Sequence, residues 1–223
     1  MSEDNTGDPL DHPDVHRLFG MANELINESD RGAILICAEQ VNDQLEDLFN
    51  KAAPPSMPEG NVKDILRRGP LKYLQPRNQV AAITGLIGTD LNYSIDQLRV
   101  LRNKAAHGTN PFRLRDHLDK IHAIYNLGEG VPRFINELAV HTILHSNVSR
   151  MLDLRVDIGN GEEARFKHPS DAIEWMRNNP EIMEAQGDWV PRLELGIATA
   201  MICALIIAYR DEAIERSRKD LLD

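Results

Sequence analysis

The chain has 223 residues, enough to build one substantial hydrophobic core, and a net charge of −10, which argues against a general nucleic-acid coat. Apolar residues make up 42% and aromatic residues only 5%, so a core of Leu, Ile, Val and Ala is expected, and packed helices are favoured over a β-sandwich. Cys37 and Cys203 lie in apolar segments, which indicates buried thiols rather than a disulfide framework. The acidic N-terminus lacks the basic and apolar parts of a signal peptide, so we expect a cytoplasmic protein.

The first half of the chain is expected to form a series of helices after an acidic tail. Residues 1–13 are polar and contain two prolines, which predicts a disordered tail. Apolar positions at helical spacing predict helices over residues 14–28, 31–52, 61–68, 76–88, 95–106 and 111–125. In the helix over residues 76–88, Pro76 suits the first position. The residues expected to face the core there are Val80, Ile83, Leu86 and Ile87.

The second half contains a boundary at Gly128 to Gly130, and residues 128–187 are expected to be an insertion. Within it the sequence predicts a helix over 134–151, a β-hairpin over 152–166 and a helix over 170–178 capped by Ser170. A long helix follows over 191–220. Its apolar part, Leu195 to Tyr209, is shorter than the roughly 20 residues that span a membrane, so we expect it at a bundle centre or a dimer interface. The predicted fold class is all-α: a helical bundle formed by residues 14–223 as a single domain.

Residues 94–108, S-I-D-Q-L-R-V-L-R-N-K-A-A-H-G, concentrate the chemistry of the chain. Ser94 suits an N-cap, and Gln97 three residues later completes a capping box. Gly108 suits the position just after a helix. The last turn carries a guanidinium, an amide and an imidazole, from Arg102, Asn103 and His107. On one straight helix, five residues subtend about 140°, so Arg102 and His107 diverge unless the helix ends near residue 106 or a second copy supplies one of them.

This string, Arg102-Asn103-Lys104-Ala105-Ala106-His107, resembles the signature of the HEPN superfamily. The surrounding chain resembles the mannitol operon repressor family, all-helical bacterial proteins related to that superfamily. The resemblance covers about half of the chain: residues 33–49, Gly69-Pro70-Leu71, residues 77–88, and the Pro191-Arg192 pair with the helix after it. Some mannitol-repressor-like proteins lack the Arg and the His, so the two families imply different activities.

The HEPN resemblance implies a metal-independent endoribonuclease of toxin or defence type, active as a homodimer with a shared cleft, with no cofactor and with an antitoxin or other regulatory protein as a possible partner. His107 would transfer protons, since an imidazole titrates near neutral pH. Arg102 would stabilise developing charge on the phosphate, and Asn103 would orient the phosphate or the imidazole. The mannitol repressor resemblance implies instead a non-catalytic transcriptional regulator that acts through protein–protein contacts. A third interpretation is structural: a His favoured by the helix C-terminus and an Arg in a salt bridge.

The motif lies in a basic part of an acidic protein. Between Lys63 and Lys120 there are eleven basic and five acidic residues, whereas the rest has 14 basic and 30 acidic ones. The weaker candidates for RNA contacts are Lys104, Arg99, Arg113, Arg115 and Arg77. A solvated basic face or pairing with the acidic parts of the chain would give the same pattern.

Other sites have little support in the sequence. His141 and His145 share a helix face at metal-ligand spacing, but no Cys or carboxylate accompanies them, so no metal site is expected. The chain has no P-loop, dinucleotide fingerprint, nucleophile elbow or C-x-x-C pair, and no helix-turn-helix is evident.

Overall fold

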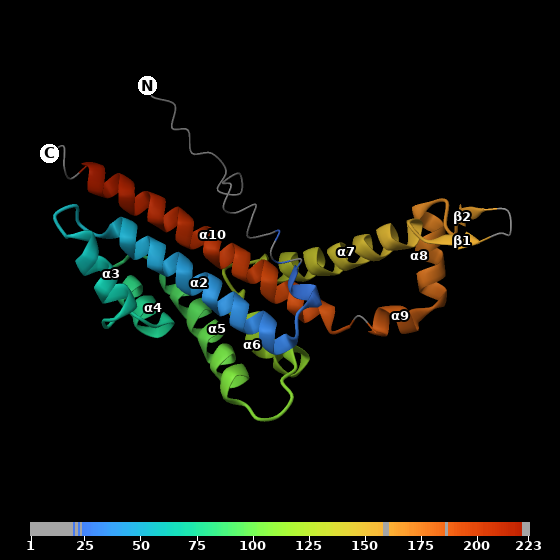
Figure 1. The fold of residues 1–223 in the computed structure, drawn as a ribbon, viewed down its shortest axis with the longest axis horizontal. Helices are drawn as coiled ribbons and strands as arrows, with labels where there is room; N and C mark the ends of the chain where they lie inside the picture. Colours follow the sequence, from blue (N-terminus) through green and yellow to red (C-terminus); the bar gives the residue numbers. More distant parts are fainter. Residues whose placement is uncertain (1–19, 21, 23, 158–160, 186, 220–223) are drawn as a thin grey trace, which may run out of the picture.

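The computed structural model describes residues 20, 22, 24–157, 161–185 and 187–219. In these residues the chain is an all-α helical bundle with a small two-stranded sheet, as the sequence predicts (Figure 1). In chain order the elements are η2 (Leu25–Asn27), α2 (Asp30–Ala52), α3 (Glu59–Arg67), α4 (Leu74–Ile83), α5 (Thr89–His107), η3 (Leu114–His117), α6 (Leu118–Ile124), α7 (Val131–Leu152), β1 (Arg155–Asp157), β2 (Glu162–Ala164), α8 (Pro169–Asn178), α9 (Pro180–Ala185) and α10 (Trp189–Lys219). The expected tail and most of the expected helix over residues 14–28 lie outside the described residues.

Helices α2 and α10 form the centre of the bundle and run side by side (Figure 1). They point in the same direction, because ion pairs join their beginnings and, further along, their later turns. Arg192 Nε lies 2.5 Å from Asp30 Oδ1, and Arg210 Nη1 lies 2.7 Å from Asp47 Oδ2. Parallel neighbours need a long connection, and α3 to α9 supply it.

The apolar stripe of α2 is buried as its spacing predicts, with its five core positions fully inaccessible: Ile34, Cys37, Val41, Leu45 and Leu48. Ser29 caps this helix by accepting a hydrogen bond from the Gly32 N–H at 3.0 Å.

Helix α10 is long and apolar enough to cross a membrane, by length and composition over Trp189–Glu215, yet 78% of its apolar window is buried inside the fold. Leu195, Ile202 and Ile206 are fully inaccessible and pack into the main core. The sequence-based expectation of a helix at the centre of a bundle is therefore confirmed. Burial also raises the pKa of the Cys37 and Cys203 thiols, which face this core.

Helix α5 begins six residues earlier than its capping signal predicts. Gly88 is the N-cap, and Ser94 lies inside the helix with its hydroxyl buried and without a hydrogen-bond partner. The predicted Ser94 cap is therefore wrong. Leu91 explains the difference, because it is buried one turn before Ile95 and extends the apolar face of the helix.

Helix α4 ends at Ile83, five residues before the predicted end. Gly85 has a φ of +71°, a conformation that favours glycine and ends the helix. Ile83 is 84% exposed, so the expectation that it faces the core is wrong. The buried face of α4 consists instead of Arg77, Asn78 and Ala81.

The part of the chain expected to be an insertion begins inside the bundle and ends outside it. The first half of α7 packs into the main core through Ile135 and Ala139, and its second half projects away towards α8 and the sheet (Figure 1). There a second small core forms from Val148, Met151, Phe166, Ala172 and Met176. That residues 128–187 are an insertion stays a prediction.

The predicted hairpin is present as an antiparallel pair, with Arg155 opposite Ala164, although α7 includes Leu152 and the first strand begins later than expected. Helix α8 starts at Pro169, so the predicted Ser170 cap is wrong and His168 occupies the cap position. The backbone N–H of His168 donates to Asp171 Oδ2 at 3.3 Å. Proline favours the first helical position, which moves the cap to the preceding residue.

Candidate functional site

The two halves of the predicted catalytic motif lie in different surroundings. Arg102 and Asn103 line a groove of about 510 Å³ between α5, α2 and residues 72–76, which link α3 to α4 and begin α4. The Arg102 Nη1 donates to Asn103 Oδ1 at 3.2 Å, and both side chains are half-buried. The remaining polar and charged side chains of the groove are Glu39, Asn42, Lys72, Tyr73, Gln75 and Arg99.

The amphipathic pattern of α5 positions this pair. Leu98, Leu101 and Ala105 are fully buried against the bundle, which holds the rotation of the helix. With about 100° between successive residues, Arg102 then falls at one border of the buried face and Asn103 lies further towards solvent. The groove therefore receives a guanidinium and an amide from one helical turn.

His107 lies outside this groove. Helix α5 includes His107 as its last residue, and the imidazole is exposed. The two side chains therefore diverge by about 140° in one chain, and the convergence expected for a helix ending near residue 106 does not occur. His107 does follow Asn103 at i, i+4 spacing, so both belong to the same side of the helix.

The chain after His107 is held against the start of α2. Arg31 Nη2 donates to the carbonyl oxygens of Gly108 and Asn110, each at 3.0 Å. The Leu114 N–H donates to Asp30 Oδ2 at 2.8 Å. These bonds anchor the loop that carries the end of the motif helix, so the backbone of His107 is held from both sides.

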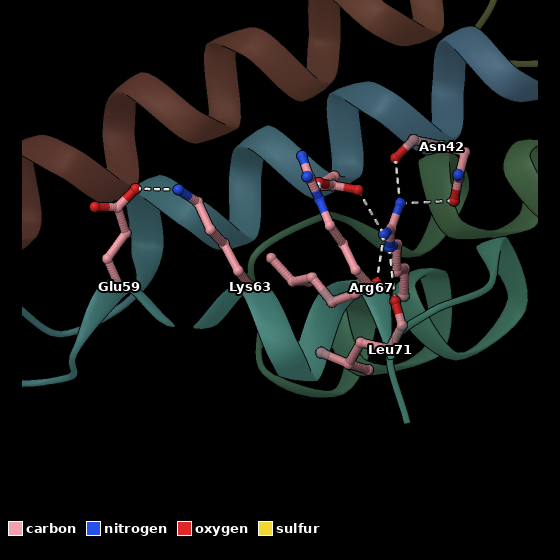
Figure 2. A network of polar contacts seen from close by, with 8 residues as sticks. Asn42, Glu59, Lys63, Arg67 and Leu71 are labelled. Carbon is pink, nitrogen blue, oxygen red and sulfur yellow. Dashed lines mark hydrogen bonds and ion pairs between the residues drawn. The ribbon is translucent and has the colours of Figure 1, made fainter. Parts of the chain in front are cut away.

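Arg77 has a structural role and is not the RNA contact that its position in the basic region predicts. It is 1% exposed, and its guanidinium donates five hydrogen bonds. Figure 2 labels two of its partners, Asn42 and Leu71. The acceptors are the carbonyl oxygens of Leu71, Asn42 and Leu66, the Asn42 amide oxygen and the Glu46 carboxylate, at 2.7–2.9 Å. Every N–H group is thereby occupied, so this side chain is unavailable to a ligand.

The other candidates for RNA contacts differ in whether a carboxylate pairs with their charge. Arg99 lines the groove but pairs with Asp96, with Nη2 and Oδ1 2.8 Å apart. Arg115 pairs with Asp188 across the loop that leads into α10. Lys104 and Arg113 are exposed. The structure therefore brings only Arg99 of these residues to the groove, and it neutralises that charge in part.

Intramolecular pairing accounts for much of the basic region. Lys63, Arg67 and Arg68 all lie within 4 Å of a carboxylate on α2 or α3. Within the described part of the chain, no carboxylate forms an ion pair with Lys72 or Arg102. Both cations line the groove, and Glu39 is the acidic residue that lines it with them.

Lys72 and Tyr73 are the residues that sequence reasoning missed. Tyr73 is 66% exposed, and Lys72 Nζ lies 5.3 Å from the centre of its ring. The available signal was a cation next to an aromatic residue, directly after the Gly69-Pro70-Leu71 string. Nothing in the local sequence places that pair beside α5, because the groove joins segments about 30 residues apart.

The described residues contain no group of three or more His, Cys, Asp or Glu side chains that can hold a metal ion. His141 and His145 are both exposed, and their rings stack with centroids 6.4 Å apart.

Comparison of the chain with protein-family models, with curated proteins and with solved structures finds no match.

Proposed function

We propose that this protein is a metal-independent endoribonuclease of the HEPN type, with Arg102, Asn103 and His107 as its catalytic residues. The observation that carries the proposal is the placement of Arg102. Its guanidinium lines a groove large enough for a nucleotide, holds an amide partner, and has no carboxylate partner among the residues described. A structural arginine is paired, as Arg77 is with Glu46, whereas an arginine that binds phosphate keeps donors free.

The proposed reaction is an internal transfer at phosphorus. Neutral His107 takes the proton of a ribose 2′-hydroxyl, and the 2′-oxygen bonds to the adjacent phosphorus. The bond from phosphorus to the 5′-oxygen breaks, and that oxygen takes a proton from a second imidazolium or from water. The products carry a 2′,3′-cyclic phosphate and a 5′-hydroxyl. Arg102 stabilises the extra negative charge on the phosphoryl oxygens, for which its planar fork of donors is suited.

A homodimer completes the proposed site. In one chain, His107 points about 140° away from Arg102, so a single copy does not surround one phosphate with both groups. A two-fold axis near the C-terminal end of α5 would place the exposed His107 of one subunit towards the groove of the other. The loop anchored by Arg31 would hold His107 in position for that contact.

The test is cleavage of a mixed single-stranded RNA by purified protein in EDTA. We expect cleavage that leaves 2′,3′-cyclic phosphate ends, with a loss of about 10²–10⁴-fold in His107→Ala, because proton transfer is removed. Arg102→Lys should also lose activity, since a point charge does not reproduce the fork. His141→Ala is the matched control, an exposed histidine on α7 outside the site, and should retain full activity. Uncut RNA with wild-type protein would reject the proposal.

The second candidate is a non-catalytic regulator that acts through protein contacts. One observation favours it: an apolar pocket of about 370 Å³ lies between the end of α2, α3 and the end of α4, lined by Phe49, Met57, Ile65, Leu71 and Leu86. Met57 and Ile65 are partly exposed at this pocket. If wild-type protein leaves RNA intact, this candidate replaces the ribonuclease.

A further inference from the structure

Tyr73 presents an aromatic face at the groove that contains Arg102. It is the N-cap residue of α4 and is 66% exposed, although its neighbour Leu74 packs against the main core. Lys72 Nζ lies over the ring, 5.3 Å from its centre. The groove thus combines a largely exposed aromatic ring with two cations that no described carboxylate pairs, Lys72 and Arg102.

Arg77 anchors the segment that carries Tyr73 through hydrogen bonds to its backbone and to α2. Arg77 Nε donates to the Leu71 carbonyl at 2.7 Å, while its other nitrogens donate to Asn42 and Glu46 on α2. The Lys72 N–H donates to the Gly69 carbonyl at 3.2 Å. Arg77 is therefore a positioning residue for the Lys72-Tyr73 pair, and the exposed ring stands on an ordered backbone. An exposed aromatic on an ordered backbone is pre-organised for stacking.

We propose that Tyr73 is a stacking platform for an unpaired nucleobase, so that the substrate class of the proposed ribonuclease is single-stranded RNA. This inference rests on the proposed function for its biological ligand. Stacking on an aromatic ring beside phosphate-binding cations is how proteins hold single strands without sequence preference. In a duplex both faces of every interior base are already stacked, so the ring finds no free base face except at the two ends. Lys72 and Arg102 take the flanking phosphates, and Glu39 opposes them from α2.

Binding of single-stranded DNA tests the platform separately from cleavage, because DNA lacks the 2′-hydroxyl that the reaction consumes. The probe is a fluorescein-labelled oligonucleotide of about ten nucleotides, followed by anisotropy at low salt. We expect Tyr73→Ala to lose about fivefold to hundredfold in affinity and Tyr73→Phe to retain it, since the ring does the stacking. Phe134→Ala is the matched control, an aromatic residue on α7 that is 53% exposed, and should bind as wild type does. Glu39→Gln should bind more tightly.

A tryptophan in place of Tyr73 supplies a direct signature of stacking. Tyr73→Trp should bind the probe and show fluorescence quenching on binding that wild-type protein does not show, because neither Trp175 nor Trp189 lines the groove. Equal affinity for the duplex form of the probe, loss of binding in Tyr73→Phe, or no binding of the single strand by wild type would each overturn the inference. Tyr73-dependent binding without RNA cleavage would keep the platform and reject the ribonuclease. Cleavage unaffected by Tyr73→Ala would reject the platform alone.

Discussion

Arg192 Nε lies 2.5 Å from Asp30 Oδ1, so the first turn of α10 is joined to the first residue of α2 across 162 positions of the sequence. Both side chains are largely buried, and the second oxygen of Asp30 accepts the Leu114 N–H. One carboxylate therefore holds together the two central helices and the loop that follows the motif helix.

Removal of that carboxylate should destabilise the whole bundle. Asp30→Ala leaves the Arg192 guanidinium and the Leu114 N–H without their partner, and we expect a loss of about 3–5 kcal/mol in the free energy of unfolding. The measurement is denaturant unfolding followed by circular dichroism. Glu137→Ala is the control: the Arg133–Glu137 pair is exposed, so its loss should leave the free energy of unfolding unchanged. Equal effects of the two substitutions would contradict the assignment.

Two arginines that share one carboxylate should differ sharply in their contribution to the free energy of unfolding. Arg77 Nη2 and Arg67 Nε bind the two oxygens of Glu46, but Arg77 is buried and the Arg67 side chain is 67% exposed. Arg77→Lys should cost about 3 kcal/mol, because an ammonium does not reach the separated acceptors of the guanidinium. Arg67→Ala should change stability by less than about 1 kcal/mol. Thermal melts of both variants check this, and a similar shift in both would be the contrary result.

Subunit mixing distinguishes a composite site from a site within one chain. If Arg102 and His107 of different subunits form each site, a dimer of Arg102→Ala with His107→Ala contains one intact site. Random reassembly of the two inactive variants should then restore about a quarter of wild-type activity, since half of the dimers are mixed and each has one of two sites. The measurement is RNA cleavage after joint unfolding and refolding. No recovery, from variants that each refold, would place both groups in one chain.

Glu194 should make stability depend on pH. This carboxyl is 2% exposed, and burial raises its pKa more than the hydrogen bond from Asn136 and the charge of His122 lower it. The folded protein therefore binds this proton more tightly than the unfolded chain does, so the contribution of Glu194 is present at low pH and is lost as pH rises through the raised pKa. The window opens at the ordinary value of about 4.3 and extends upward.

Glu194→Gln removes this titration and retains an acceptor for the Asn136 amide, which donates to Glu194 Oε1 at 2.6 Å. The melting temperature of the variant minus that of wild type should increase from pH 4 to about pH 8. A difference that stays constant over this range would show that the carboxyl does not titrate in it.

The spacing of apolar residues along the chain correctly predicted the helices whose buried faces it defines. The stripe of α2 and the burial of α10 follow from apolar residues at helical spacing, which any fold that buries those faces must respect. The same reasoning failed for Ser94, because a capping signal competes with the burial of Leu91 one turn earlier. It failed for Ile83 because periodicity does not say where a helix ends, whereas the left-handed Gly85 does.

The candidate site was predictable only in its motif. Arg102, Asn103 and His107 are evident as a string of residue types, and their angular separation follows from helix geometry alone. The groove depends on contacts between α2, the segment around Tyr73 and α5, which come from distant parts of the chain. For the same reason the sequence does not distinguish a structural arginine such as Arg77 from one that binds a ligand. Only the fold shows that acceptors 6 to 35 residues away bind its guanidinium. Helical periodicity is a property of adjacent residues, whereas burial and pairing of a charge are properties of packing.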